Sequence, residues 1–248
     1  MRKDINTLDL NKTKTTDLLE SPNSPVYVSP DDNVLLVGPG ILGDESCGFG
    51  PMDPGLITLA CHLSKGTGNL TVLDLNPEDK LGGDKDWEAV KLQMDKWADS
   101  GAKFAPYFFI EGNILSPPKS LKTYDKIIDH HTWAFATKSR WGGYGEKVPQ
   151  YKLMSDLAKS YSSLLDDRGR LICYFVGIES KRVSLLVHSL LKQNICSTQH
   201  LGLEDTYELK DPTILKHYDY LRLTDGQMEG NYMKPWYKAD GFILAQKC

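Results

Sequence analysis

The feature that most constrains the fold of this chain is an alternation of short apolar runs and amphipathic segments that begins at residue 33. The apolar runs are typical of strands buried on both faces of a sheet, and the segments between them carry apolar residues at helical spacing. Strands are predicted at 33–37, 70–75, 104–110, 126–129, 171–176 and 241–245, and helices at 54–63, 86–99, 151–165 and 180–192. This order predicts β-α-β units and an α/β fold with a mainly parallel sheet.

The polar segment before this alternation is predicted to be an N-terminal arm or lid over residues 1–30. Residues 31–248 are predicted to form a single domain, because no linker-like stretch divides them and their length suits one sizeable core. No apolar run reaches the ~18–20 residues of a membrane span. The polar start has no secretory apolar stretch, so a cytoplasmic protein without membrane contacts is expected.

Charge and cysteine usage lower the expectation for two classes of partner. The formal net charge is -4, whereas nucleic-acid binders usually carry a basic face, so no nucleic-acid partner is expected. Neither a disulfide framework nor a structural zinc pattern is predicted, because the five cysteines include no C-x-x-C pair. They are expected to be small buried or incidental thiols, at Cys47, Cys61, Cys173, Cys196 and Cys248. The sequence carries no signal for an oligomeric state.

Candidate functional residues follow the predicted strands, where ligands bind on parallel sheets. After the first strand comes a run of Gly38, Pro39 and Gly40, whose glycines can adopt positive φ and approach a ligand closely. Taken alone, such a pattern fits a plain turn as well as a nucleotide loop. Asp74, which ends the second strand, can accept both hydroxyls of a ribose or can cap the next segment. Asn113, after the third strand, offers a donor and an acceptor to the edge of an adenine.

Together these positions resemble a known family, the class I or Rossmann-like S-adenosylmethionine-dependent methyltransferases, over about residues 33–248. Gly38-Pro39-Gly40 resembles the first motif of that family, Asp74 its ribose-binding acid, and Gly112-Asn113-Ile114 its adenine motif with Asn in place of Asp. Asp129 falls at the fourth motif, and 241–247 is similar to the terminal antiparallel strand. The resemblance implies a three-layer sandwich with a mainly parallel seven-stranded sheet, its last strand antiparallel and helices on both faces.

The resemblance also implies S-adenosylmethionine as the cofactor and S-adenosylhomocysteine as its product. Leu36 departs from the family because an acidic residue usually stands there, so the amino group of the cofactor needs another partner. The insertion at 41–53 is expected to line or cover the pocket, where Asp44 or Glu45 either supplies that carboxylate or is a solvated loop acid. The predicted cofactor contacts are Gly38, Pro39, Gly40, Asp74, Leu75, Asn113, Ile114, Asp129 and His130.

His130 and His131, after the fourth strand, are the candidate catalytic residues. Histidine titrates near neutral pH and can deprotonate an acceptor, and His131 is assigned to the acceptor and His130 to the cofactor. The alternative for each is a structural or exposed histidine. Asp129, His130 and His131 resemble part of a metal site, but metal-dependent methyltransferases would need further acidic ligands after the fifth strand. Only Glu179 is available there, so no metal is expected. Three aromatic residues are predicted to bind the acceptor, namely Trp133, Trp141 and Tyr144. Aromatic side chains suit a planar or cationic small molecule. The alternative is that the same residues pack a small lid.

The sequence therefore predicts methyl transfer from S-adenosylmethionine to a small-molecule acceptor with a hydroxyl or an amine. One alternative is a catalytically weak, methyltransferase-like binding or scaffold protein, which the atypical Leu36 and the long loop motivate. Another is an NAD(P)-dependent dehydrogenase, because Gly38, Gly40 and Gly43 match the dinucleotide fingerprint in spacing. Against the dehydrogenase, Gly43 leads into further loop residues, whereas the third fingerprint glycine should pack inside a helix.

Overall fold

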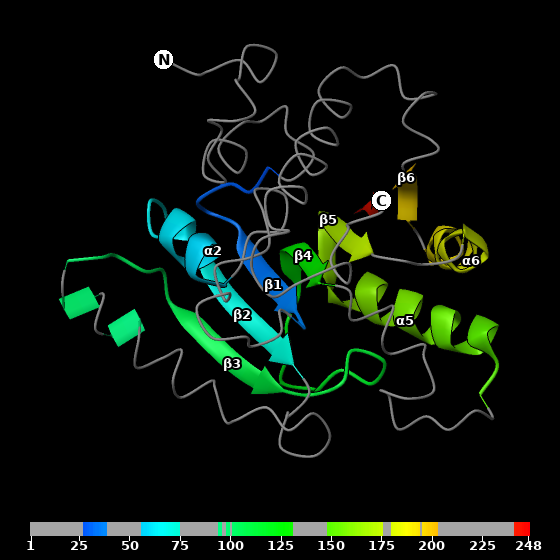
Figure 1. Ribbon diagram of the computed structural model, residues 1–248, viewed down its shortest axis with the longest axis horizontal. Helices are drawn as coiled ribbons and strands as arrows, with labels where there is room; N and C mark the ends of the chain where they lie inside the picture. The colour runs from blue at the N-terminus through cyan, green and yellow to red at the C-terminus, as the bar shows by residue number, and fades with distance from the viewer. Residues whose placement is uncertain are drawn as a thin grey trace, which may run out of the picture.

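The computed structural model of the chain describes residues 27–38, 56–74, 94–95, 98–99, 101–130, 148–175, 180–193, 195–202 and 241–248. These residues form a seven-stranded sheet with the order β3-β2-β1-β4-β5-β7-β6 (Figure 1). Its strands are β1 (Asn33–Val37), β2 (Asn69–Asp74), β3 (Tyr107–Glu111), β4 (Tyr124–His130), β5 (Leu165–Phe175), β6 (Ile195–Gly202) and β7 (Gly241–Lys247). The helices described in full are α2 (Leu56–Leu63), α5 (Gln150–Leu164) and α6 (Ser180–Leu191).

The strand directions confirm the predicted fold class. The pairs from β3 to β5 are all parallel, and β7 runs antiparallel to both of its neighbours, β5 and β6. β1 lies between β2 and β4, so the order of the strands reverses beside it. In open α/β sheets, ligands bind beyond the carboxyl ends of the strands at such a switch point.

Alternate residues of the central strands bury on opposite faces of the sheet, as the pleat requires. Leu35, Ile127 and Leu171 belong to one apolar cluster with the buried faces of α5 and α6. Leu36, Ile128 and Ile172, one position further along each strand, are also buried but lie outside that cluster. α2 packs against β2 on that second side, and helices therefore cover both faces (Figure 1).

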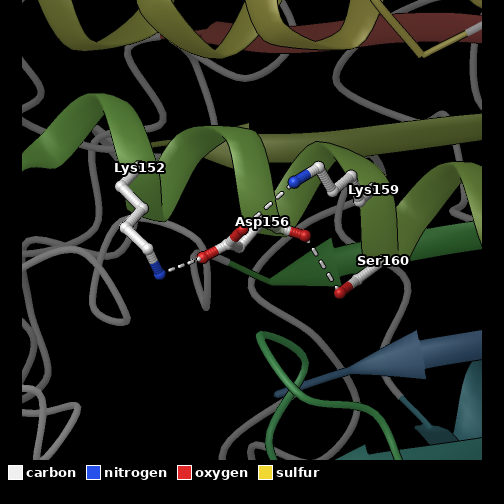
Figure 2. Close-up of polar contacts among 4 residues, drawn as sticks. All are labelled: Lys152, Asp156, Lys159 and Ser160. Atoms are coloured by element: carbon white, nitrogen blue, oxygen red, sulfur yellow. Dashed lines mark hydrogen bonds and ion pairs between the residues drawn. The ribbon is translucent and has the colours of Figure 1, made fainter.

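Helix α5 shows why a mixed sequence forms a helix here. Its buried face carries seven residues at helical spacing, namely Leu153, Met154, Leu157, Ala158, Ser160, Tyr161 and Leu164. Figure 2 shows the solvent side, where Asp156 lies between Lys152 and Lys159 with N–O distances of 3.0 and 3.5 Å. The backbone oxygen of Asp156 also accepts a hydrogen bond of 3.1 Å from the Ser160 hydroxyl. Exposed pairs of this kind contribute little stability, so burial of the apolar face holds α5 on the sheet.

Charged groups gather at the amino edge of the sheet, opposite the predicted ligand edge. The carboxylate of Asp125 accepts hydrogen bonds from the backbone N–H of Asn33 (2.8 Å) and from its side-chain amide (3.1 Å). The next residue, Lys126, is only 7% exposed. Burial lowers the pKa of Lys126 to about 8, although the nearby carboxylate of Asp32 acts in the opposite direction. Burial likewise raises the pKa of Asp32. Burial of the charged Lys126 side chain therefore lowers the free energy of unfolding.

Some sequence expectations are corrected and others fall outside the described residues. The runs predicted no strand at Ile195–Gly202, which forms the sheet edge as β6. Cys61 and Cys173 form no disulfide, as expected. Cys248 is disulfide-bonded, which corrects the expectation of an incidental thiol. The sequence could not predict this bond, because spacing along the chain does not tell which cysteines meet in space. The arm before residue 27, the insertion at 41–53 and most of the helix at 86–99 lie outside the described residues.

Candidate functional site

The candidate site begins at Gly38, directly after β1. Gly38 has a φ of 57°, in the left-handed region that glycine adopts without the steric cost of a Cβ atom. Its backbone N–H donates a hydrogen bond of 2.8 Å to the carbonyl oxygen of Leu73. This bond fixes the start of the glycine loop beside the end of β2, where Asp74 follows.

Asp74 is the last residue of β2 and is half-buried. Its carbonyl oxygen accepts a hydrogen bond of 2.8 Å from the backbone N–H of Gly112, just after β3. Asp74 therefore lies between the glycine loop after β1 and the turn after β3. Three predicted cofactor-binding segments meet at this residue, as their places at successive strand ends predicted.

Asn113 belongs to a tight turn after β3. Its side-chain oxygen accepts a hydrogen bond of 2.9 Å from the N–H of Leu115, and its carbonyl oxygen accepts one of 2.9 Å from the N–H of Ser116. Such Asx-type bonds fix the backbone conformation of a turn. Ile114 is 1% exposed, and its side chain packs into the apolar core. Two hydrogen bonds thus define the turn, and Ile114 contributes its side chain to the core.

Asp129 ends the apolar part of β4, and its side chain is fully buried. In the sheet it lies opposite Val37 on β1 and opposite Cys173 on β5. Its Oδ2 accepts a hydrogen bond of 2.5 Å from the hydroxyl of Tyr161, a fully buried residue of α5. The thiol of Cys173 hydrogen-bonds the same tyrosine hydroxyl. Asp129 is thus part of a buried polar chain that links β4, β5 and α5.

The electrostatics of this chain keep its two donors protonated. Burial, followed by the negative charge of Asp129, holds the pKa of the Tyr161 phenol well above its ordinary value. The same two causes raise the pKa of the Cys173 thiol, and its hydrogen bond with Tyr161 opposes them. Both the Tyr161 phenol and the Cys173 thiol are therefore protonated near pH 7.

The sequence did not identify Tyr161 or Cys173 as site residues, because each sits in an apolar pattern. Tyr161 lies in the apolar stripe of α5, and Cys173 lies in the apolar run at the end of β5. One signal was available, since a tyrosine on a buried stripe needs a partner for its hydroxyl. That partner could be chosen only once β4 and α5 were known to be neighbours.

The remaining predicted site residues are described in part or lie outside the described residues. The backbone of His130 ends β4 opposite Tyr174, and its side chain is outside the described set. Leu36, where the resemblance implies an acid, is fully buried in β1. Seven predicted site residues lie outside the described residues altogether, namely Pro39, Gly40, Leu75, His131, Trp133, Trp141 and Tyr144.

Within the described part of the chain, no group of three or more histidine, cysteine or acidic side chains is arranged to hold a metal ion. None of the helices found there combines the length and apolarity needed to cross a membrane.

The solved structures similar to this chain include S-adenosylmethionine-dependent methyltransferases. One, from Methanosarcina mazei, has 15% identity over 92% of this chain and 97% of that chain, with a TM-score of 0.47. Another is the N-methyltransferase NodS from Bradyrhizobium japonicum in complex with S-adenosyl-L-homocysteine, with 12% identity over 97% of this chain and 87% of that chain and a TM-score of 0.47. No protein-family profile and no curated protein sequence matches the chain.

Proposed function

We propose that the chain transfers a methyl group from S-adenosylmethionine to a small-molecule acceptor with a hydroxyl or an amine, in the cytoplasm. The observation that carries this proposal is the hydrogen bond from Gly38 to Leu73, which sets a left-handed glycine beside Asp74 at the switch point of the sheet. Close backbone approach and a carboxylate for ribose hydroxyls are the two requirements of a nucleoside there.

In the proposed complex, the described residues bind the adenosine part of the cofactor. Asp74 accepts from the ribose hydroxyls, while the amide of Asn113 and the backbone of Ile114 meet the edge of the adenine. The other proposed cofactor contacts follow strand ends in the sequence, at Pro39, Gly40, Leu75, Asp129 and His130. The aromatic residues Trp133, Trp141 and Tyr144 are proposed to bind the acceptor.

Methyl transfer needs alignment more than covalent help from the protein. The acceptor oxygen or nitrogen attacks the methyl carbon as the carbon–sulfur bond breaks, and the sulfonium becomes a neutral thioether. Holding the two reactants in line supplies much of the acceleration. The acceptor loses one proton in the reaction, and His131 is proposed to take it, with His130 on the cofactor side.

The sheet favours this function over a nicotinamide dehydrogenase. The dinucleotide-binding sheet has the strand order 3-2-1-4-5-6. In this chain the antiparallel β7 lies between β5 and β6, which supports the resemblance to methyltransferases. The scaffold alternative shares this sheet and differs only in turnover.

Calorimetry with the full chain tests the proposal. S-adenosylmethionine and S-adenosylhomocysteine should bind, NAD should not, and Asp74→Ala should weaken cofactor binding at least ~10-fold. Glu111→Ala is the matched control, because Glu111 is the exposed acid directly opposite Asp74 on β3. Unchanged cofactor affinity in Asp74→Ala would overturn the placement of the cofactor. Binding without turnover on a broad panel of hydroxyl and amine acceptors would favour the scaffold.

A further inference from the structure

The strand pair formed by β6 and β7 has two cysteines beside one of its ends. Lys247 of β7 pairs with Ile195 of β6, and each of these two residues is directly followed by a cysteine, Cys248 and Cys196. The register shifts between Ile195 and Ser197, so two steps along β6 match one step along β7. Cys196 therefore stays level with the end of β7, where Cys248 follows.

Further contacts hold both strand ends in place. The ammonium group of Lys247 donates a hydrogen bond of 2.7 Å to the carbonyl oxygen of Leu165, at the start of β5. Ile195 is buried in the apolar cluster on the side of α5 and α6. Two residues earlier, the carbonyl oxygen of Gln193 accepts a hydrogen bond of 2.6 Å from the Ser162 hydroxyl of α5. The backbones beside the two cysteines are thus held close together on neighbouring strands, as a disulfide requires.

The disulfide of Cys248 has two candidate partners within the chain. Cys61 and Cys173 form no disulfide, which leaves Cys196 and Cys47. Cys47 follows β1 in the sequence, and β1 ends at the carboxyl edge of the sheet, with β4 and β5 between it and β7. Cys248 lies at the opposite, amino edge, because β7 runs antiparallel to β5. The register therefore favours Cys196.

We propose that Cys196 and Cys248 form a disulfide, here called the β6–β7 clasp, which closes and opens with the thiol–disulfide balance around the protein. In the reducing cytoplasm proposed above, disulfides are rare and those that form are usually redox-sensing. Exposed disulfides exchange readily with small thiols, and Cys248 is exposed. The clasp lies at the edge of the sheet away from the candidate cofactor site, so it does not depend on methyl transfer.

A small disulfide such as oxidised glutathione is the oxidant that closes the clasp. The thiolate of Cys248 attacks one sulfur of this disulfide and displaces the first glutathione thiol. Cys196 then attacks the mixed disulfide at the sulfur of Cys248 and displaces the second. Two protein thiols are oxidised to one disulfide, one glutathione disulfide is reduced to two thiols, and the two protons pass to the glutathione thiolates. Reduced glutathione opens the clasp by the reverse steps.

The closed clasp should stabilise this side of the sheet. β6 is the edge strand and pairs with β7 alone among the described strands. The β6–β7 ladder encloses the long connection 203–240, and a disulfide that closes a long loop lowers the entropy of the unfolded chain. The redox state should therefore change how firmly β6 and β7 are held on the sheet.

Peptide mapping of the full chain tests which cysteines are joined. The chain is equilibrated with oxidised glutathione, its remaining thiols are alkylated, and it is cleaved after acidic residues without reduction. Mass spectrometry should find the fragment 180–204, which contains Cys196, joined to the fragment 241–248, which contains Cys248. Cys248 joined to Cys47, to a second chain or to no cysteine would overturn the proposal.

Thermal unfolding tests the effect of the clasp. Reduction with dithiothreitol should lower the Tm of the oxidised wild-type chain by ~5–15 °C. Cys196→Ser and Cys248→Ser should each unfold at the same temperature with and without the reductant, and Cys47→Ser is the matched control that should keep the wild-type shift. A wild-type shift in Cys196→Ser, or no shift in the wild-type chain, overturns the clasp. If Cys196→Ser does not fold, Cys248→Ser decides by the same criterion, and the mapping needs no variant.

Discussion

A Cβ atom added at Gly112 would lie 2.5 Å from the Cγ atom of Pro118, so no side chain fits between the end of β3 and this proline. Gly112 also donates to the carbonyl oxygen of Asp74 and precedes Asn113. The glycine therefore keeps the Asn113 turn close to β2.

We expect Gly112→Ala to lower the free energy of unfolding by ~1–3 kcal/mol, because the turn must shift to admit the methyl group. Cofactor affinity should fall as well, since Asn113 moves with the turn. Urea unfolding and calorimetry measure the two effects. Gly101→Ala is the control: its φ of 97° makes alanine strained, but nothing lies within 4 Å of the added atom. It should cost stability and leave cofactor binding unchanged.

The left-handed conformation of Gly38 gives a second prediction. Gly38→Ala should cost ~1–2 kcal/mol of stability, because a Cβ atom is unfavourable at positive φ. It should also weaken S-adenosylmethionine binding, because the glycine loop starts here. Gly38→Asn should lose less stability in urea unfolding, since asparagine tolerates this region better. Equal losses in the two variants would contradict a conformational origin.

The hydroxyl of Tyr161 should contribute measurably to stability. Tyr161→Phe keeps the ring and leaves the buried Asp129 carboxylate without this donor, so we expect a loss of ~1.5–3 kcal/mol in urea unfolding. Asp156→Asn is the matched control on the exposed side of the same helix (Figure 2). Its two ion pairs are solvated, so its loss should be below ~1 kcal/mol. A larger loss for Asp156→Asn than for Tyr161→Phe would contradict this account.

Lys126 makes stability depend on pH. Its pKa falls from 10.5 to about 8 on folding, chiefly through burial. Between those pH values the unfolded chain binds more protons than the folded chain, so this residue makes the free energy of unfolding rise with pH. The full effect is ~3 kcal/mol.

Replacing the charge should remove that dependence. Lys126→Met keeps the length of the side chain, and at pH 7 it should stabilise the fold by ~1–3 kcal/mol, because no ammonium group has to be buried. Urea unfolding at several pH values between 7 and 10 checks the prediction as a difference between variant and wild type, in which the titrations of other groups cancel. The advantage of the variant should shrink as pH rises, and a constant difference would refute the assignment.

The two histidines after β4 should differ in their effect on turnover. With an identified acceptor, His131→Ala should lower kcat by ~100-fold or more if it takes the acceptor proton. His130→Ala should raise the KM for S-adenosylmethionine more than it lowers kcat. Steady-state kinetics separates the two parameters. Full activity in both variants would show that neither histidine is the base.

The central strands and α5 and α6 were predictable because their apolar spacing is strong. The predicted helices at 151–165 and 180–192 agree with α5 and α6 to within one residue at each end. Val34 to Val37 form a continuous apolar run, and a buried parallel strand requires such a run.

Other parts of the sheet were not predictable from local pattern. β6 contains Ser197, Thr198 and Gln199 and lies at an edge, where one partner strand is enough and apolar periodicity is weak. β5 starts earlier than its apolar run, because Leu165 pairs with Tyr124 before residues 166–169 interrupt the register. Arg168, within that interruption, has a φ of 64°, so the backbone departs there from the extended conformation of a strand.

The sequence predicts which strand ends form the candidate site, but it does not predict the buried side-chain hydrogen bond behind them. Gly38, Asp74 and Asn113 follow strands directly, so sheet topology alone brings them together. The bond between Tyr161 and Asp129 joins residues 32 positions apart on different elements. The two residues meet only because α5 lies beside β4, and their spacing in the sequence does not predict this contact.

The antiparallel β7 lies between β5 and β6, so β6 touches the sheet only through a strand that comes later in the chain. Residues 195–202 can complete no ladder until residues 241–247 have docked. Closure of this side should thus be a late step of folding, limited by a long loop. In native-state hydrogen exchange, the amides of β6 and β7 should open together as one cooperative unit, at a lower free energy than β1 and β4.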